Sequence, residues 1–270
     1  MIPEDTKAII KKKLKKGRIV CLTGAGISAE SGIPTFRGTG GLWEKYNPQT
    51  YATPEGLLSV LRTRPHRLAE FIIDFYSVLL EARPNAAHTT LALLEKEGIV
   101  SSVITQNIDN LHQEAGSRRV IELHGNSYRL VCMGCRKKIT VEKERMKEFT
   151  RLLHQSKGSY YKVLETLSRY FPRCHCGGRY RIDIVFFGES LAQDQLQEAY
   201  AELETCETLL LIGSSFIVYP AAELPLHAKK HKATLIEINS EPSALSAICD
   251  YTLTVKASEG LPYLLQVLKE

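Results

Sequence analysis

Short apolar, strand-like segments alternate with helical patterns along most of the chain, and this alternation restricts the possible folds more than any other feature. Six such segments recur, and most are followed by an amphipathic stretch: RIVCLTG, VSSVITQN, VIELHG, TLLLIGSS, ATLIEIN and DYTLTV. Strands that alternate with helices are typical of a parallel sheet covered by helices on both faces. The sequence therefore predicts an α/β fold.

The alternation breaks in two places. Residues 45–84 are largely helical in pattern, and residues 128–181 contain two cysteine pairs and a basic stretch with one or two amphipathic helices. Two insertions into one α/β core predict a large domain and a small one. The large domain is expected to comprise residues 1–44, 85–127 and 182–270, and the small helical and zinc-binding domain residues 45–84 and 128–181.

The length and composition indicate a globular, intracellular chain. The 270 residues are 44% hydrophobic, and no apolar run approaches the roughly 20 residues of a membrane span. Neither a signal peptide nor a disulfide framework is expected, because the start of the chain is basic and polar and the seven cysteines are an odd number. We expect a soluble, cytoplasmic protein, with a nuclear location also compatible.

Positive charge is concentrated in two segments. Residues 1–18 hold seven Lys/Arg and two Asp/Glu, and residues 136–173 hold eleven Lys/Arg and four Asp/Glu. Charge runs are usually solvated helix faces, and that interpretation is preferred here. A contact between the 136–173 segment and an acidic partner or nucleic acid is the minority hypothesis.

A glycine-rich turn follows the first strand-like segment. Gly24, Gly26 and Ala29 match the dinucleotide-binding turn, in which glycines permit close approach to a pyrophosphate and the next helix offers its N-terminus. A tight turn that binds nothing is the alternative. A long Gly- and Pro-rich loop then replaces the second strand of a hydride-transfer enzyme, although Glu44 has about the right spacing for a ribose ligand. This favours a dinucleotide that is consumed.

Two close cysteine pairs indicate a structural zinc site. Cys132, Cys135, Cys174 and Cys176 provide the four thiolates that tetrahedral zinc needs, and four protein ligands leave no open position for catalysis. The gap between the pairs exceeds the usual spacing of a zinc ribbon. Four unrelated thiols, or His175 in place of one cysteine, are the alternatives.

Polar residues stand where several strand-like segments end. Because parallel strands present their carboxyl ends at one edge, these side chains are expected to share that edge with the glycine turn. They are Gln106, Asn107 and Asp109, His124, Gly213, Ser214 and Ser215, and Asn239. A histidine suits proton transfer near neutral pH, whereas capping and turn formation explain any one of the others alone.

Taken together, these motifs resemble those of the sirtuins, the NAD-dependent protein lysine deacylases. The resemblance covers about residues 18–257 and rests on GAGISAESGIPTFRG, TQNIDNLHQEAG, ELHG, the cysteine pairs, IVFFGE, GSSFIVYPAAELP and EIN. It implies a Rossmann-type NAD-binding domain with a smaller zinc-bearing domain. It also implies that acyl-lysine in a protein or peptide is the substrate and that NAD is the co-substrate.

The resemblance implies a role for each matching residue. His124 is expected to be the catalytic base, with Asn107 and Asp109 at the nicotinamide ribose and the reactive water. The NAD-binding set comprises Gly24, Ala25, Gly26, Ala29, Thr35, Phe36, Arg37, Gln106, Asn107, Ile108, Asp109, Gly213, Ser214, Ser215, Asn239, Ser240, Glu241, Lys256 and Ala257. The acyl-lysine tunnel and the edges that clamp the peptide as an added strand are expected to comprise Val185, Phe187, Gly188, Glu189 and Val218.

The implied reaction splits NAD. The acyl oxygen attacks the ribose carbon as nicotinamide departs, which gives an alkylamidate. His124 then deprotonates a ribose hydroxyl that attacks this intermediate, and water completes the conversion to lysine, nicotinamide and O-acyl-ADP-ribose.

Three departures from the family pattern are present. Thr35 stands where Asp is frequent, and Ile182 follows Arg181 where Pro is usual. Members that remove acidic acyl groups carry Tyr and Arg at positions that align, without gaps, with Ile72 and Phe75. An apolar pair offers no carboxylate partner, so neutral acyl groups, acetyl or longer fatty chains, are expected.

Three other functions compete with deacylation. A mono-ADP-ribosyltransferase would use the same NAD site. A zinc-ribbon binding module with a vestigial NAD pocket would not need Gln106, Asn107, Asp109 and His124 together, and a conventional dehydrogenase would need the missing second strand.

Overall fold

The computed structural model describes residues 7–8, 11–12, 14, 17–34 and 42–270, which form two compact units. Of these described residues, unit 1 comprises those within 1–31, 83–124 and 191–270, and unit 2 comprises those within 32–82 and 125–190. Residues 182–190, expected in the parallel-sheet domain, group with unit 2, as do residues 32–34, 42–44 and 125–127, whereas residues 83–84, expected in the small domain, group with unit 1. The reason is pairing: β6 (Tyr180–Ile184) joins an antiparallel sheet, and the Phe187 N–H donates to the Ala52 carbonyl at 2.8 Å.

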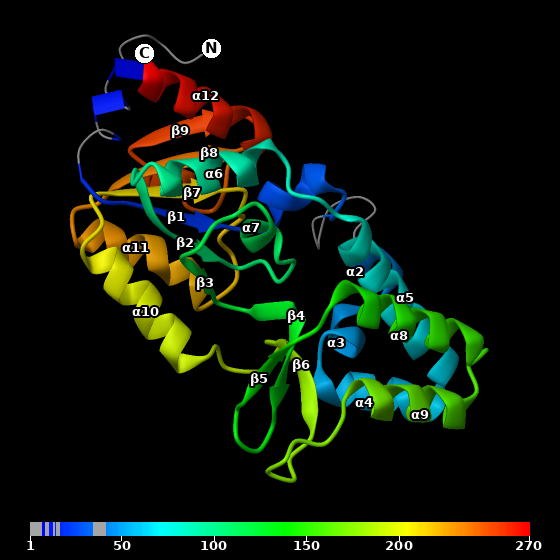
Figure 1. Cartoon of the computed structure of the whole chain (residues 1–270). Helices are drawn as coiled ribbons and strands as arrows, with labels where there is room; N and C mark the ends of the chain where they lie inside the picture. Colours follow the sequence, from blue (N-terminus) through cyan, green and yellow to red (C-terminus); the bar gives the residue numbers. More distant parts are fainter. Residues whose placement is uncertain (1–6, 9–10, 13, 15–16, 35–41) are drawn as a thin grey trace. The chain divides into compact units, whose positions relative to one another are not determined.

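Unit 1 is built on a six-stranded parallel sheet, as the alternating pattern predicts (Figure 1). The strand order is β3, β2, β1, β7, β8, β9. The bounds are Val120–Glu122 for β3, Val100–Thr105 for β2, Ile19–Thr23 for β1, Thr208–Ile212 for β7, Thr234–Asn239 for β8 and Tyr251–Thr254 for β9.

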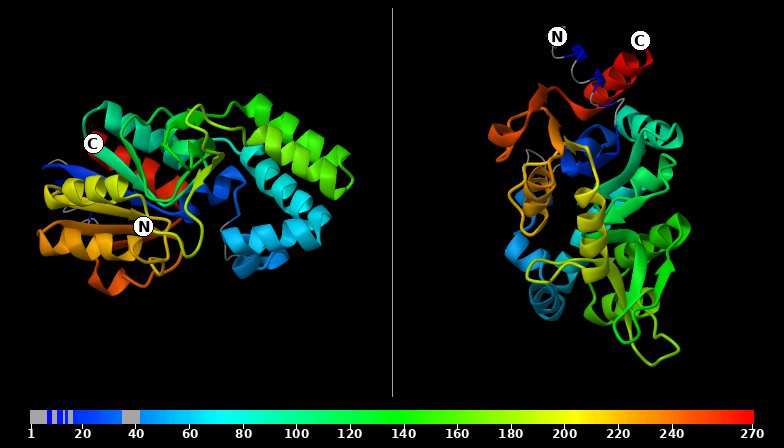
Figure 2. Two further views of the ribbon diagram at one scale, coloured as in Figure 1. Left: turned by 90° about the horizontal axis from the view of Figure 1, so that it is seen from below. Right: turned by 90° about the vertical axis from the view of Figure 1, so that its left-hand side faces the viewer.

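Helices cover both faces of this sheet (Figure 2). Along β1, Ile19 and Cys21 pack on one face with α6 and α12, whereas Val20 and Leu22 pack on the other with α10 and α11. Because both faces are covered, the central strands β1 and β7 are buried at every position and are mainly apolar. The helices are α6 (Ala86–Lys96), α7 (Leu111–Glu114), α10 (Gln193–Glu204), α11 (Leu224–Lys230) and α12 (Ala257–Lys269), with 3-10 helices η1 (Ala25–Ser31), η2 (Ala221–Glu223) and η3 (Ser246–Ile248).

Unit 2 combines helices with a small antiparallel sheet in the order β5, β4, β6. Aromatic side chains pack between the helices of unit 2. The rings of Phe149 in α8 and Tyr170 in α9 stack with their centroids 3.8 Å apart, and Tyr76 of α5 contacts both rings edge-on. The elements are α2 (Leu42–Lys45), α3 (Pro48–Tyr51), α4 (Pro54–Thr63), α5 (Pro65–Glu81), β4 (Gly125–Cys132), β5 (Lys138–Thr140), α8 (Lys143–Gln155) and α9 (Tyr160–Tyr170). None of the helices in the described part of the chain has the length and apolar character that a membrane span requires.

Candidate active site

The carboxyl ends of the parallel strands bring the expected polar residues to one edge of unit 1. Hydrogen bonds link neighbouring strand ends directly. The Gln106 N–H donates to the Thr23 carbonyl, the Gly24 N–H to the Ile212 carbonyl and the Gly213 N–H to the Ile238 carbonyl, each at 3.0 Å. The side chains continue this row: Gln106 Nε2 donates to Ser214 Oγ and Asn239 Nδ2 to the Ser214 carbonyl, both at 3.0 Å.

The glycine turn after β1 packs tightly against the turn after β7. A Cβ atom on Gly26 would lie 2.8 Å from the Gly213 Cα, and one on Gly24 would lie 2.6 Å from the Ser214 Cβ. Glycine is therefore required here for contact between the two turns, in addition to any approach by a pyrophosphate. The segment that follows is the 3-10 helix η1, at the position where the dinucleotide-binding pattern predicts a helix.

The imidazole of His124 is oriented by the backbone of the neighbouring strand end. Its Nδ1 lies 2.8 Å from the Gln106 carbonyl, which can only accept, so Nδ1 carries the proton and Nε2 is the basic nitrogen. Burial lowers the pKa of His124 below the ordinary value of a histidine, and the Gln106 carbonyl opposes part of that shift. A neutral ring with a fixed tautomer is suited to act as a general base.

Asn107 and Asp109 are buried and share one partner, Ser28. The Ser28 hydroxyl donates to Asp109 Oδ2 at 2.7 Å and accepts from Asn107 Nδ2 at 3.0 Å. Asn107 also donates to the Gly24 carbonyl at 3.1 Å, and the Leu111 N–H donates to Asp109 Oδ1 at 2.9 Å. Burial raises the pKa of Asp109, although the bonds from Leu111 and Ser28 act in the opposite direction.

Two buried histidines support this network, and the sequence reasoning gave neither of them a role. His88 accepts from the Asn85 N–H through Nδ1, so Nε2 carries the proton and faces Ser28 Oγ at 3.4 Å. His112 Nε2 lies 3.0 Å from Thr23 Oγ1, and the two imidazole rings meet edge-on at 5.0 Å. Both histidines lie inside the motifs PNAAH and NIDNLH, which was the only available signal.

A chain of hydroxyls connects His112 to Asn107. The Thr23 hydroxyl donates to Thr105 Oγ1 at 2.8 Å, and that oxygen also accepts the Asn107 N–H at 3.0 Å. Thr23 Oγ1 can then accept a hydrogen bond from the Nε2–H of His112, and in this tautomer Nδ1 carries no proton. That nitrogen is buried and has no hydrogen-bond partner among the described residues.

The remaining expected NAD contacts differ in exposure. Ala29, Ser215, Ser240, Glu241 and Lys256 are exposed, Ala25 and Ile108 are half-buried, and Ala257 is buried. Lys256 pairs with Glu30 of η1 at 2.7 Å. Thr35, Phe36 and Arg37 lie outside the described residues.

The expected substrate residues follow β6 in unit 2, except Val218, which is half-buried in unit 1. Arg181 holds this segment through a bidentate ion pair with Glu189, and Glu189 also accepts the Phe186 N–H at 3.0 Å. The Arg181 guanidinium lowers the pKa of Glu189. Val185 is half-buried, whereas Phe187 and Gly188 are exposed.

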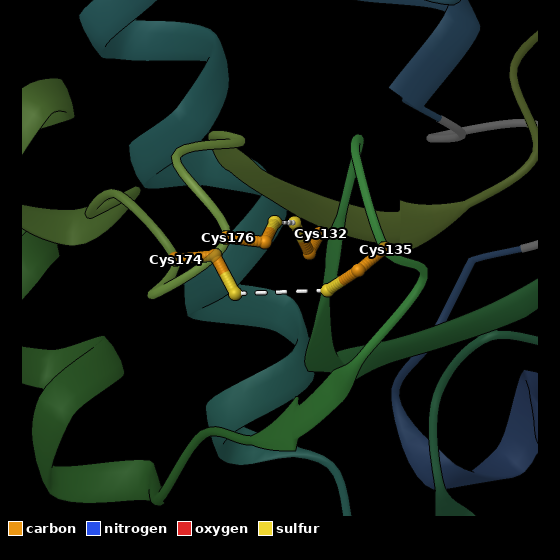
Figure 3. Close-up of side chains that lie close together, drawn as sticks. All are labelled: Cys132, Cys135, Cys174 and Cys176. Atoms are coloured by element: carbon orange, nitrogen blue, oxygen red, sulfur yellow. Dashed lines mark hydrogen bonds between the residues drawn. The ribbon is translucent and has the colours of Figure 1, made fainter.

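The four cysteines of the two pairs converge at the end of β4 in unit 2 (Figure 3). The Sγ atoms of Cys132 and Cys176 are 3.5 Å apart, and those of Cys135 and Cys174 are 3.7 Å apart. Tetrahedral zinc with Zn–S bonds of about 2.3 Å separates its sulfurs by about 3.8 Å, so the cluster fits a structural zinc ion. His175 is not part of this cluster.

The comparisons with known proteins agree with this arrangement. The model of the Sir2 family matches residues 24–220. An NAD-dependent protein deacylase of Pyrococcus furiosus is 42% identical over 270 residues, which are 100% of this chain and 98% of that protein. NAD-dependent protein deacylase 2 of Archaeoglobus fulgidus is 43% identical over 257 residues, or 94% and 92% of the two chains.

Solved structures give the same result. A Sir2 homolog in complex with NAD has a TM-score of 0.79 at 36% identity, covering 97% of this chain and 93% of that one. A Sir2 complex with a p53 peptide and NAD+ has a TM-score of 0.73 at 35% identity, covering 94% and 95% of the two chains.

Proposed function

The chain belongs to the Sir2 family, and from this premise we propose the reaction that its site carries out. The protein is an NAD-dependent protein deacylase, and the proposed products of its reaction are free lysine, nicotinamide and O-acyl-ADP-ribose. The observation that carries the proposal is the orientation of His124. Its Nδ1 proton is held by the Gln106 carbonyl, so the basic Nε2 belongs to the edge of the sheet that also carries the glycine turn, Asn107 and Asp109.

NAD supplies the ribose carbon that accepts the acyl oxygen, and the residues of this chain position and deprotonate the reactants. His124 Nε2 takes a proton from a ribose hydroxyl. Asn107 and Asp109 hold the ribose and a water molecule, since both are fixed by Ser28 and are buried where bulk water is excluded. The turns at Gly24 and Gly213 form the pyrophosphate and adenosine side, together with Ser214 and Asn239.

A neutral acyl group is the proposed substrate class. Ile72 and Phe75 lie on α5 among the hydrophobic residues of unit 2, and Phe75 stacks against Phe71 at 6.3 Å. Neither side chain offers a charge to an acyl carboxylate, and burying such a carboxylate without a partner is costly. Acetyl and longer fatty acyl groups are therefore preferred over succinyl.

The test is product analysis with three substrates. Peptides carrying acetyl-, myristoyl- or succinyl-lysine are incubated with and without NAD, and all products are identified by mass spectrometry. We expect NAD-dependent release of lysine from the neutral substrates, together with nicotinamide and O-acyl-ADP-ribose. An Ile72→Tyr/Phe75→Arg variant should gain desuccinylation relative to an Ile72→Leu/Phe75→Leu control of equal thermal stability, and an absence of gain would refute the acyl assignment.

Mono-ADP-ribosyl transfer is the alternative on the same site, and the named relatives do not favour it. It would appear in the same experiment as a mass increase of the protein substrate in place of free O-acyl-ADP-ribose. A dominant mass increase would replace the deacylase assignment.

Contact of the 136–173 segment with an acidic partner or nucleic acid is a minor part of the proposal, and its support is the charge excess alone. Several of its basic side chains pair within their own helix, as Lys147 does with Glu144, Arg151 with Glu148 and Arg169 with Glu165, which is typical of a solvated face. Nucleic-acid binding that does not weaken with added salt would contradict it.

A further inference from the structure

A second group of possible metal ligands lies in unit 1, apart from the four cysteines. Glu204 is the last residue of α10, His227 lies in α11, and His231 directly follows α11. One ligand atom from each of the three residues lies within 4.8 Å of the other two. The two helices pack side by side, as both views show (Figures 1 and 2).

We propose that Glu204, His227 and His231 form a surface zinc site that joins the C-terminal ends of α10 and α11. Two imidazoles and one carboxylate are a ligand set that tetrahedral zinc uses with a water molecule in the fourth position. This proposal does not depend on the deacylase reaction, because none of the three residues is among those assigned to NAD, acyl-lysine or the cysteine site.

The orientation of His231 fits metal binding. Its Nδ1 donates to the His227 carbonyl at 3.0 Å, which fixes the tautomer and leaves Nε2 with its lone pair. A metal-bound histidine generally donates its other ring N–H to a carbonyl or a carboxylate in this way. The spacing of four residues places both imidazoles on the same side of the helix end.

His227 shows the clearest sign of a missing partner. Its Nε2 is buried and has no hydrogen-bond partner among the described residues. The nearest carboxylate oxygen, Glu204 Oε1, is 3.7 Å away, which is too far for a hydrogen bond. Two ligands on a tetrahedral zinc ion at bonds of about 2.0 Å lie about 3.3 Å apart, so a small side-chain movement would accommodate the metal. A weak His227–Glu204 ion pair is the competing explanation.

The local electrostatics favour a cation on balance. The C-termini of α10 and α11 both end at the cluster, and each contributes partial negative charge beside the Glu204 carboxylate. Lys230 opposes metal binding, whereas the positive charge of Lys229 is paired with Asp250 at 3.4 Å.

Ring contacts hold the imidazoles of His227 and His231 in place without a bound metal. His227 meets the Tyr200 ring of α10 edge-on at 4.7 Å and lies 4.4 Å from the His231 ring. A site on packed helices with fixed rings loses little side-chain entropy on binding. The structure thus offers a preorganised pair of imidazoles and an exposed carboxylate as the third ligand.

The test counts zinc in the tag-free, full-length protein. The protein is dialysed against a low micromolar Zn²⁺ solution, and zinc per chain is measured by mass spectrometry. We expect two zinc ions per chain in the wild type, one in a His227→Ala/His231→Ala variant and two in a His154→Ala control, whose exposed histidine lies outside the cluster. One zinc ion in the wild type, or two in the double variant, would overturn the proposal.

Thermal unfolding supplies the second measurement. Added Zn²⁺ should raise the Tm of the wild type and of His154→Ala by a few degrees, because a ligand that binds only the folded state stabilises it. It should leave the Tm of the double variant unchanged. If that variant does not fold, Glu204→Gln/His231→Gln changes only exposed side chains and must show the same loss, and equal shifts in all proteins would refute the site.

Discussion

At the scale of single residues, the two buried histidines His88 and His112 make the folding stability of the protein sensitive to acid. Burial, together with the neighbouring His88, lowers the pKa of His112 to about 3, and burial lowers that of His88 to about 4. In the unfolded chain both imidazoles bind a proton near pH 6.5. Between this pH and the lower pKa values of the folded state, the unfolded state therefore binds more protons than the folded state. Stability is therefore fully present above pH 6.5 and is lost as the pH falls toward these lower values.

A His112→Gln variant tests this directly. Glutamine keeps a donor near the position of Nε2 for Thr23 but does not titrate. Between pH 7 and pH 5 the wild type should lose about 2 kcal/mol more unfolding free energy than the variant. Urea unfolding at both values measures the difference, and zinc loss at low pH is common to both proteins. Equal losses would show that His112 is not buried in its neutral form.

The pKa of His124 leads to a second prediction. Because its pKa is lowered, the base stays neutral below the ordinary titration range of histidine, and kcat/KM should remain high until the pH is below 6.5. A pH profile of kcat/KM on an acetyl-lysine peptide measures this acid limb. A midpoint above 6.5 would contradict the assigned environment of the ring.

The sequence pointed to the residues that are proposed to contact the substrates, but not to the residues that hold them in place. His124, Asn107 and Asp109 stand at predicted strand ends, where position alone suggests chemistry. Ser28 and His112 are buried behind them, and their role depends on distances that only the folded backbone sets. A histidine within an apolar helix reads the same whether it is a core residue or part of a polar network.

At the scale of elements, the turns after β1 and β7 act as one structure. Gly26→Ala would place a Cβ atom 2.8 Å from both the Cα and the carbonyl oxygen of Gly213, and backbone cannot yield as a flexible side chain can. The turns must separate, and we expect NAD affinity to fall about tenfold or more, a loss of about 1.4 kcal/mol. Isothermal titration with NAD measures it.

Gly98→Ala is the matched control. Gly98 has a φ of +74° with no atom within 4 Å of an added Cβ, so the change strains the backbone without a clash. It should cost about 1 kcal/mol of stability and leave NAD affinity unchanged. If both variants lose NAD affinity equally, general destabilisation and not the contact between the turns is the cause.

Loss of one zinc ligand from the cysteine cluster is expected to destabilise the antiparallel sheet. Cys135→Ser should lower the zinc content by one ion per chain and reduce the Tm, because the metal cross-links the end of β4 to the segment before β6. Cys249→Ser, which changes a half-buried thiol outside the cluster, should retain its zinc. Unchanged zinc content in Cys135→Ser would remove this cysteine from the ligand set.

The predicted elements differ in how well the pattern identified them. All six apolar segments form the parallel strands, and the pattern is clearest in β1 and β7, which are buried at every position. The strands β5 and β6, with the sequences KIT and YRIDI, are short and partly charged, so periodicity did not separate them from loops. The sequence pattern also did not reveal that the helix after β1 is the 3-10 helix η1.

At the scale of the whole molecule, the chain passes between its two units after residues 31, 82, 124 and 190. Unit 1 carries those members of the proposed NAD-binding set that the structure describes, and it carries His124 as the last residue of its segment 83–124. Unit 2 carries the cysteine cluster and most of the proposed substrate residues. The sequence predicted two insertions into one α/β core and placed residues 182–190 in that core. These residues belong to the smaller unit because β6 pairs with β4 in the antiparallel sheet.

The most direct test of the account is the effect of His124→Ala on product formation. The wild type, His124→Ala and the His154→Ala control are incubated with NAD and an acetyl-lysine peptide, and lysine peptide, nicotinamide and O-acetyl-ADP-ribose are quantified together. We expect the three products in equal amounts from the wild type and from the control, and a loss of about 100-fold or more of deacetylated peptide in His124→Ala. Deacetylation at the wild-type rate in His124→Ala would contradict it.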